Sequence, residues 1–133
     1  MIKPIVRDMF FLQQKSVPAG PADASSAQDL LDTLTAHRGR CVGMAANMIG
    51  VRKRIIAVDQ IGIMLNPVIL RREGAYPAEE GCLSLGGTRS TTRYQLIEVA
   101  YQDAAFRSKK QVFVGWTAQI IQHECDHLDG ILI

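Results

Sequence analysis

Residues 119–130 read QIIQHECDHLDG and place two histidines four positions apart near the end of the chain. An α-helix turns about 100° per residue, so residues four apart lie on one face, and His123 and His127 can bind the same metal ion. Glu124 is one position from His123 and can reach a water on that ion. This spacing predicts a helical metal site that carries its own acid/base residue.

The residues around the two histidines predict that this helix is buried. Ile120, Ile121 and Leu128 are apolar. Burying two histidines and a glutamate among them costs stability unless a ligand satisfies their polar atoms, and a metal ion does so. We expect the helix to run from Thr117, as its N-cap, to about Leu128.

Two histidines are too few ligands for a stable catalytic metal site, so a third ligand is needed. Only residues 128–133 follow His127, and Asp129 faces elsewhere on the helix, so the third ligand is expected upstream. The candidates are His37, Cys41, Cys82 and several carboxylates. Cys82 is favoured because Gly81 lets the backbone approach an ion closely, and because one thiolate and two imidazoles leave a fourth position open for water. The alternative is that Cys82 is a small core residue.

Two further residues of the helix have less certain roles. Cys125 points away from both histidines and is expected in the core rather than on the metal. Asp126 either orients a ligand histidine or pairs with an arginine, and the sequence leaves both interpretations open.

Composition limits the kind of protein and of partner. The chain has 133 residues, 47% of them apolar, which predicts one folded domain over residues 1–133. Fifteen Lys and Arg against thirteen Asp and Glu leave a net charge of +2, too even for nucleic acid or an anionic membrane to be the main partner. No apolar run approaches the roughly 20 residues that cross a bilayer. Three widely spaced cysteines do not resemble a disulfide framework, so a reducing cytoplasm is expected.

Hydrophobic periodicity predicts an α+β fold. Leucines at helical spacing predict a helix at about 26–37, with Ser25 or Ser26 as N-cap. Strands are expected at residues 54–58, 63–70, 96–101 and 111–116. Pro67 indicates an edge strand or a bulge in the second of these. The expected architecture is a set of mainly antiparallel strands packed around the C-terminal helix that carries the HExxH motif.

Three segments together carry a resemblance to a known family. They read CVGMAANMIG at residues 41–50, EGCLS at 80–84 and QHECDHLDG at 122–130, and they span about two-thirds of the chain. The last two match the EGCLS and QHExDHLxG motifs of the peptide deformylase family at every defining position and in the same order. The chain therefore resembles a peptide deformylase.

The resemblance implies a role for individual residues. It implies that Cys82, His123 and His127 bind the metal, that Glu124 is the acid/base, and that the Leu83 N–H stabilises the oxyanion. A pocket for a methionine side chain is implied at Val42, Gly43, Trp116 and Ile120. For Trp116, a place in the core instead of the pocket is an open alternative. Arg89, where the family also has an arginine, is implied to contact the peptide backbone or to hold its own loop; a solvated surface arginine is the alternative.

The resemblance also implies an activity and its partners. Members of the family remove the formyl group from the N-terminal methionine of new polypeptides and release formate. The implied substrates are formyl-Met peptides or nascent chains near the ribosome, with no membrane and no direct contact to nucleic acid. The family uses one divalent ion, natively Fe²⁺, with Zn²⁺ or Ni²⁺ as substitutes.

The first segment departs from the family pattern, which usually reads Gly-Φ-Gly-Φ-Ala-Ala-x-Gln-Φ-Gly. Cys41 stands at the first glycine and Met48 stands at the glutamine. That glutamine normally donates a hydrogen bond to the oxyanion, and methionine has no donor. The loss of one such donor costs about 2.7–4 kcal/mol of transition-state stabilisation.

Several interpretations of Met48 stay open at this point. The protein is a deformylase with reduced or retuned activity, or a metal-dependent amidase or peptidase on another acyl-amide, or an impaired protein that binds metal or peptide without catalysis. A further interpretation is that Met48 is an apolar residue that lines the site and replaces the glutamine without harm to activity. Intact Glu124 argues against a non-catalytic role, because metal binding alone does not need that carboxylate.

Overall fold

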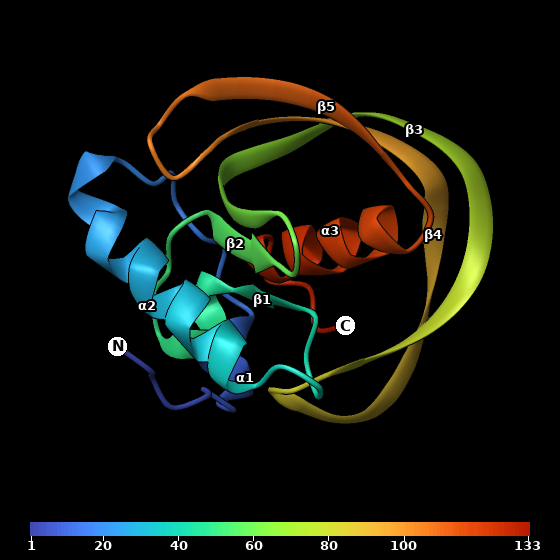
Figure 1. Cartoon of the computed structure of the whole chain (residues 1–133). Coiled ribbons are helices and arrows are strands. Elements are labelled where there is room, and N and C mark those ends of the chain that lie inside the picture. The colour runs from blue at the N-terminus through green and yellow to red at the C-terminus, as the bar shows by residue number, and fades with distance from the viewer.

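An antiparallel sheet curves around the last helix in the computed structural model, which describes residues 1–133 (Figure 1). The strands are β1 (Gly43–Ala45), β2 (Ile55–Val58), β3 (Gly62–Cys82), β4 (Leu85–Gln102) and β5 (Ser108–Val114), hydrogen-bonded in that order. The helices are α1 (Met9–Leu12), α2 (Ala24–Ala36) and α3 (Gly115–Leu128), with 3₁₀ turns η1 (Pro21–Asp23) and η2 (Ala46–Ile49). The predicted α+β class, with strands around the C-terminal helix, is confirmed.

The β3–β4 hairpin is much longer than the sequence pattern predicted. The expected strands at 63–70 and 96–101 cover only parts of strands of 21 and 18 residues. The remainder of β3 is mostly solvent-exposed and lacks apolar alternation, so periodicity could not detect it. The predicted irregularity at Pro67 is confirmed, because the register of β3 on β4 shifts between Leu65 and Val68. Figure 1 shows how the hairpin bends around α3.

The helix starts differ from the predictions. α2 begins at Ala24 with Asp23 as N-cap, so the prediction of Ser25 or Ser26 was wrong; the 3₁₀ turn η1 leads directly into the helix. α3 begins at Gly115 with Val114 as N-cap, two residues before the predicted Thr117. Gly115 has a φ of +61°, which lets the chain pass from β5 into α3 without a loop. Trp116 therefore lies on the helix and not at the end of a strand.

The core lies between the sheet and the two longer helices. Its fully buried members include Leu30 of α2, Ile56 of β2, Met64 of β3 and Ile121 of α3. Cys125 also belongs to this cluster and is 7% exposed, which confirms it as a core residue. No helix combines the length and apolar character that a membrane crossing requires.

Candidate active site

Three metal-ligand candidates meet where the end of β3 passes α3. Cys82 is the last residue of β3, and His123 and His127 lie on α3. One ligand atom from each lies within 4.8 Å of the others. The Nε2 atoms of the two histidines are 3.1 Å apart, so they face the same point. The structure thus brings the mid-chain thiol to the helical histidines, in a set that matches a tetrahedral site with one open position.

A buried polar atom beside the cluster has no partner in the protein, which fits a site that takes up a cation and its water. Glu124 Oε1 has no hydrogen-bond partner, and the Nε2 atoms of His123 and His127 face each other. Burial, assisted by the positive charge of His123, lowers the pKa of His127 to about 3, so its ring is neutral and can act as a ligand. A thiolate and a neutral imidazole are donors that Fe²⁺, Zn²⁺ and Ni²⁺ accept.

Glu124 lies beside this cluster and is almost completely buried. It is 4% exposed, and burial raises its pKa to about 7. Gly43 of β1 packs directly against it, since a Cβ built on Gly43 would lie 3.1 Å from Glu124 Oε2. A carboxylate with a pKa near the working pH is suited to accept and return a proton.

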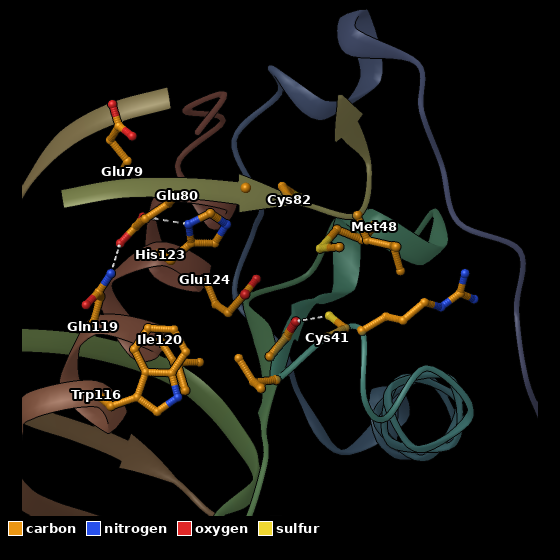
Figure 2. A pocket seen from close by; sticks show the side chains of 15 residues that line it. Cys41, Met48, Glu79, Glu80, Cys82, Trp116, Gln119, Ile120, His123 and Glu124 are labelled. Atoms are coloured by element: carbon orange, nitrogen blue, oxygen red, sulfur yellow. Dashed lines mark hydrogen bonds and ion pairs between the residues drawn. The ribbon is translucent and has the colours of Figure 1, made fainter. Parts of the chain in front are cut away.

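Glu80 fixes the orientation of His123, a role that the sequence analysis missed. Its Oε1 accepts a hydrogen bond from His123 Nδ1 at 2.7 Å, which leaves Nε2 for a metal (Figure 2). Arg93 donates through Nε and Nη2 to the same carboxylate, at 2.7–3.1 Å. A signal for Glu80 did exist, because residues two apart on a strand point to the same face, and Glu80 is two positions before Cys82.

Asp126 pairs with an arginine, which resolves the choice left open by the sequence. Arg93 Nη1 donates to Asp126 Oδ2 at 2.6 Å, so one buried guanidinium holds both Glu80 and Asp126. Burial acts to raise the pKa of Glu80, but the hydrogen bonds from His123 and Arg93 outweigh it and lower that pKa. Burial likewise acts to lower the pKa of His123, but its hydrogen bonds to Cys82 and Glu80 raise it. His123 therefore favours its protonated form without a metal, and an ion bound at Nε2 would take the place of that proton.

A cavity of about 210 Å³ adjoins the cluster. The predicted substrate-binding residues Val42, Gly43, Met48, Trp116 and Ile120 all line it, as do Leu83 and Glu124. Trp116 is 62% exposed and so is not a core residue. Arg89 is not among the lining residues; it donates instead to Gly86 O at 3.2 Å, within the first residues of β4.

Gln119 and Cys41 also line the cavity. The Gln119 side chain donates to Glu80 Oε2 at 2.9 Å and accepts from Tyr76 Oη at 3.0 Å. Figure 2 shows Cys41 and Met48 on one wall of the cavity and Trp116 and Ile120 on the other, with Glu124 between them. Met48 is 1% exposed, so it packs as an apolar wall residue.

Comparison with known proteins agrees with this geometry. The family model described as polypeptide deformylase matches residues 3–133. A peptide deformylase of Clostridium beijerinckii is 57% identical over the full length of both chains. A peptide deformylase of Symbiobacterium thermophilum is 39% identical over 91% of this chain, which spans 59% of that longer protein.

Solved structures share the fold. A class I type b peptide deformylase from Acinetobacter baumannii with Met-Ala-Ser bound has a TM-score of 0.88 and 27% identity, covering 99% of this chain and 96% of its own. The peptide deformylase from Thermotoga maritima has a TM-score of 0.89 and 27% identity, covering 99% and 95%. The chain belongs to the peptide deformylase family.

Proposed function

We propose that this protein is a metal-dependent hydrolase that removes the N-formyl group from the N-terminal methionine of newly made polypeptides and releases formate. The observation that supports this most directly is the convergence of Cys82, His123 and His127 beside the buried Glu124, at the wall of a cavity, in a member of the deformylase family.

The proposed metal ligands are Cys82 Sγ and the Nε2 atoms of His123 and His127. When bound there, a divalent ion supplies Lewis-acid activation of water and of the formyl carbonyl. We propose Fe²⁺ as the native ion and Zn²⁺ or Ni²⁺ as working substitutes. Glu80 supports this assignment, because it holds the His123 ring through Nδ1 and directs Nε2 toward the other two ligands.

Glu124 is the proposed acid/base residue. It takes a proton from the attacking water, the water oxygen bonds to the formyl carbon, and the carbon–nitrogen bond then breaks. Glu124 returns the proton to the departing amine, so the products are formate and a free N-terminus. Its pKa of about 7 supports both transfers near neutral pH.

The oxyanion is proposed to lie near the Leu83 N–H, immediately after the ligand Cys82. None of the loop and turn hydrogen bonds within the chain uses this N–H as donor, which supports its availability. Met48 provides no donor, so turnover below that of a glutamine-containing relative is expected. The methionine side chain of the substrate is proposed to contact Val42, Trp116 and Ile120.

Peptides with a formylated N-terminus are the proposed substrates. The Acinetobacter baumannii relative binds Met-Ala-Ser, which has the form of a deformylated product. We propose that the protein binds nascent chains near the ribosome, in the cytoplasm, in the same way and without direct contact to nucleic acid.

An assay of formate release tests this function. Protein loaded with Fe²⁺ under anaerobic conditions is given formyl-Met-Ala-Ser, and formate is measured. Glu124→Ala is expected to keep one equivalent of metal, measured by elemental analysis, and to lose at least about a hundredfold in turnover. Glu73→Ala, on the exposed part of β3, is the matched control and should keep wild-type turnover.

Two outcomes would contradict the proposal. Retained activity in Glu124→Ala would remove that residue from the mechanism. Hydrolysis of acetylated peptides without formate release from formylated ones would favour an amidase acting on another acyl group.

A further inference from the structure

Strand β1 has a free edge that borders the active-site cavity. It is first in the strand order and pairs only with β2. The Asp59 N–H donates to Val42 O at 2.9 Å, and backbone groups alternate between the two sides of an antiparallel strand. Gly43 and Ala45 therefore direct their N–H and C=O groups away from β2, toward the free edge.

Two sulfur atoms cap these outward backbone groups. The Cys41 thiol donates to Gly43 O at 2.8 Å, and Met48 Sδ accepts from the Ala45 N–H at 3.5 Å. Cys41 and Met48 are the two residues at which the first motif departs from the usual family pattern. Both departures thus act on the same structural feature, the free edge of β1.

The edge is well placed to bind an extended peptide. Cys41, Gly43 and Met48 line the cavity, and Gly43 packs against Glu124 (Figure 2). A peptide whose formyl group lies at Glu124 would pass along this edge, where an added strand forms main-chain hydrogen bonds with unpaired groups. The carbonyl of Gly43 is the natural acceptor for a peptide N–H, and the Cys41 thiol already occupies it.

The Met48 cap is buried, and the half-buried Cys41 thiol stays protonated. Ala45 is fully buried and Met48 is 1% exposed, so the Ala45 N–H is shielded unless Met48 moves. Burial, with the nearby Glu124 carboxylate, raises the pKa of Cys41 to about 11, so the thiol keeps its proton and remains a donor at physiological pH.

We propose that Cys41 and Met48 are specificity-determining residues that occupy the free edge of β1 and compete with the substrate backbone for it. This rests on the proposed function and defines its substrate class further. Recognition relies on the formyl-methionyl group, and the residues that follow add little affinity. Short formyl-methionyl compounds are therefore handled nearly as well as longer formylated peptides.

Trp116 provides a binding signal that does not depend on turnover, because it is the chain's single tryptophan and lines the cavity. Zn²⁺-loaded protein is titrated with Met-Ala-Ser and with methioninamide, and the two dissociation constants are taken from Trp116 fluorescence. In the wild type their ratio is expected to stay below about ten. In Cys41→Ala, which frees Gly43 O, the ratio should rise in favour of Met-Ala-Ser by about three- to tenfold. Cys41→Ser, which keeps a donor, should retain the wild-type ratio.

A ratio that is unchanged in Cys41→Ala, or that rises equally in Cys41→Ser, overturns the proposal. The infrared S–H band of the wild-type protein is a second measurement that needs no variant. The Cys41 S–H band should shift when Met-Ala-Ser binds and should not shift when methioninamide binds. A Cys41 band that does not shift with Met-Ala-Ser also overturns the proposal. The formate assay tests the proposed function separately from the proposal about the β1 edge. If no formate is released but the ratio of dissociation constants shifts as expected, the proposed function is wrong and the proposal about the edge is retained.

Discussion

Glu80 connects the charged groups of α3 to the end of β3 that carries Cys82. Glu80 is 8% exposed, and its carboxylate is hydrogen-bonded to His123 and held by two nitrogens of Arg93. A buried ion pair of this kind contributes little net stability over an apolar pair, but removing one member leaves the other charge unpaired. At the residue scale, Glu80 is therefore a positioning residue whose loss affects both the fold and the metal.

Glu80→Gln is expected to destabilise the protein by about 3–5 kcal/mol at neutral pH, because Arg93 keeps its charge and loses its anionic partner. It should also weaken metal binding by about 10- to 100-fold, because His123 loses the carboxylate that orients it. Urea unfolding and competition with a metal chelator measure the two effects. Metal affinity equal to that of the wild type would show that Glu80 does not orient His123.

The same residue predicts a pH dependence. The folded-state pKa of Glu80 lies below its ordinary value of 4.5, so its contribution is present above pH 4.5 and is lost as the pH falls toward 2. The metal-free wild-type protein should therefore lose stability over this window, and Glu80→Gln should lose less. Parallel unfolding curves for the two proteins from pH 5 to 2 would contradict this assignment.

Met48 is the residue at which turnover should respond to a single side-chain change. Met48→Gln restores an amide donor on a wall of the cavity and is expected to raise kcat on formyl-Met-Ala-Ser, by up to about 100-fold. Met48→Leu is the control, since it changes the shape without adding a donor. Unchanged turnover in Met48→Gln would mean that the Leu83 N–H and the metal are sufficient without the amide.

At the scale of elements, the close approach of β1 to α3 positions the acid/base residue. A Cβ on Gly43 would lie 2.6 Å from Ile120 Cγ2 and 3.1 Å from Glu124 Oε2, so only glycine lets the strand approach the helix this closely. This contact excludes water from Glu124 and thereby maintains its raised pKa.

Gly43→Ala should force β1 away from α3. We expect a loss of about 1–3 kcal/mol in unfolding free energy from overpacking, together with reduced kcat/KM because Glu124 shifts. Gly86→Ala is the matched control, since no heavy atom lies within 4 Å of its added Cβ. Equal stability and activity in the two variants would show that the β1–α3 contact does not constrain the site.

For the whole molecule, the proposed metal links the end of a long hairpin to the central helix. Cys82 and His123 are 41 positions apart in the chain, and the thiolate and imidazoles form a site only in the folded state. An ion that binds the folded protein and not the unfolded chain stabilises it according to its affinity.

Metal removal should therefore lower the melting temperature. At a free Zn²⁺ concentration of about 100 times its Kd, the metal is expected to add about 2.7 kcal/mol to the free energy of unfolding relative to the chelated protein. Cys82→Ser should lose most of this difference, whereas Cys41→Ala, which removes another cavity thiol, should keep it. Calorimetry with and without chelator measures the effect. A melting temperature that does not change when the metal is removed would rule out the proposed ligand set.

Local spacing in the sequence determined the helix that carries His123, Glu124 and His127, because helical periodicity alone decides which residues share a face. It also identified parts of the main strands and the irregularity at Pro67. Only the tertiary structure decided that β3 runs on to Cys82, because its exposed residues carry no apolar alternation. The same is true of the Glu80–Arg93–Asp126 contacts and the sulfur caps on β1. These depend on which strand ends meet α3, and that is set by long-range packing, which residue spacing along the chain does not encode.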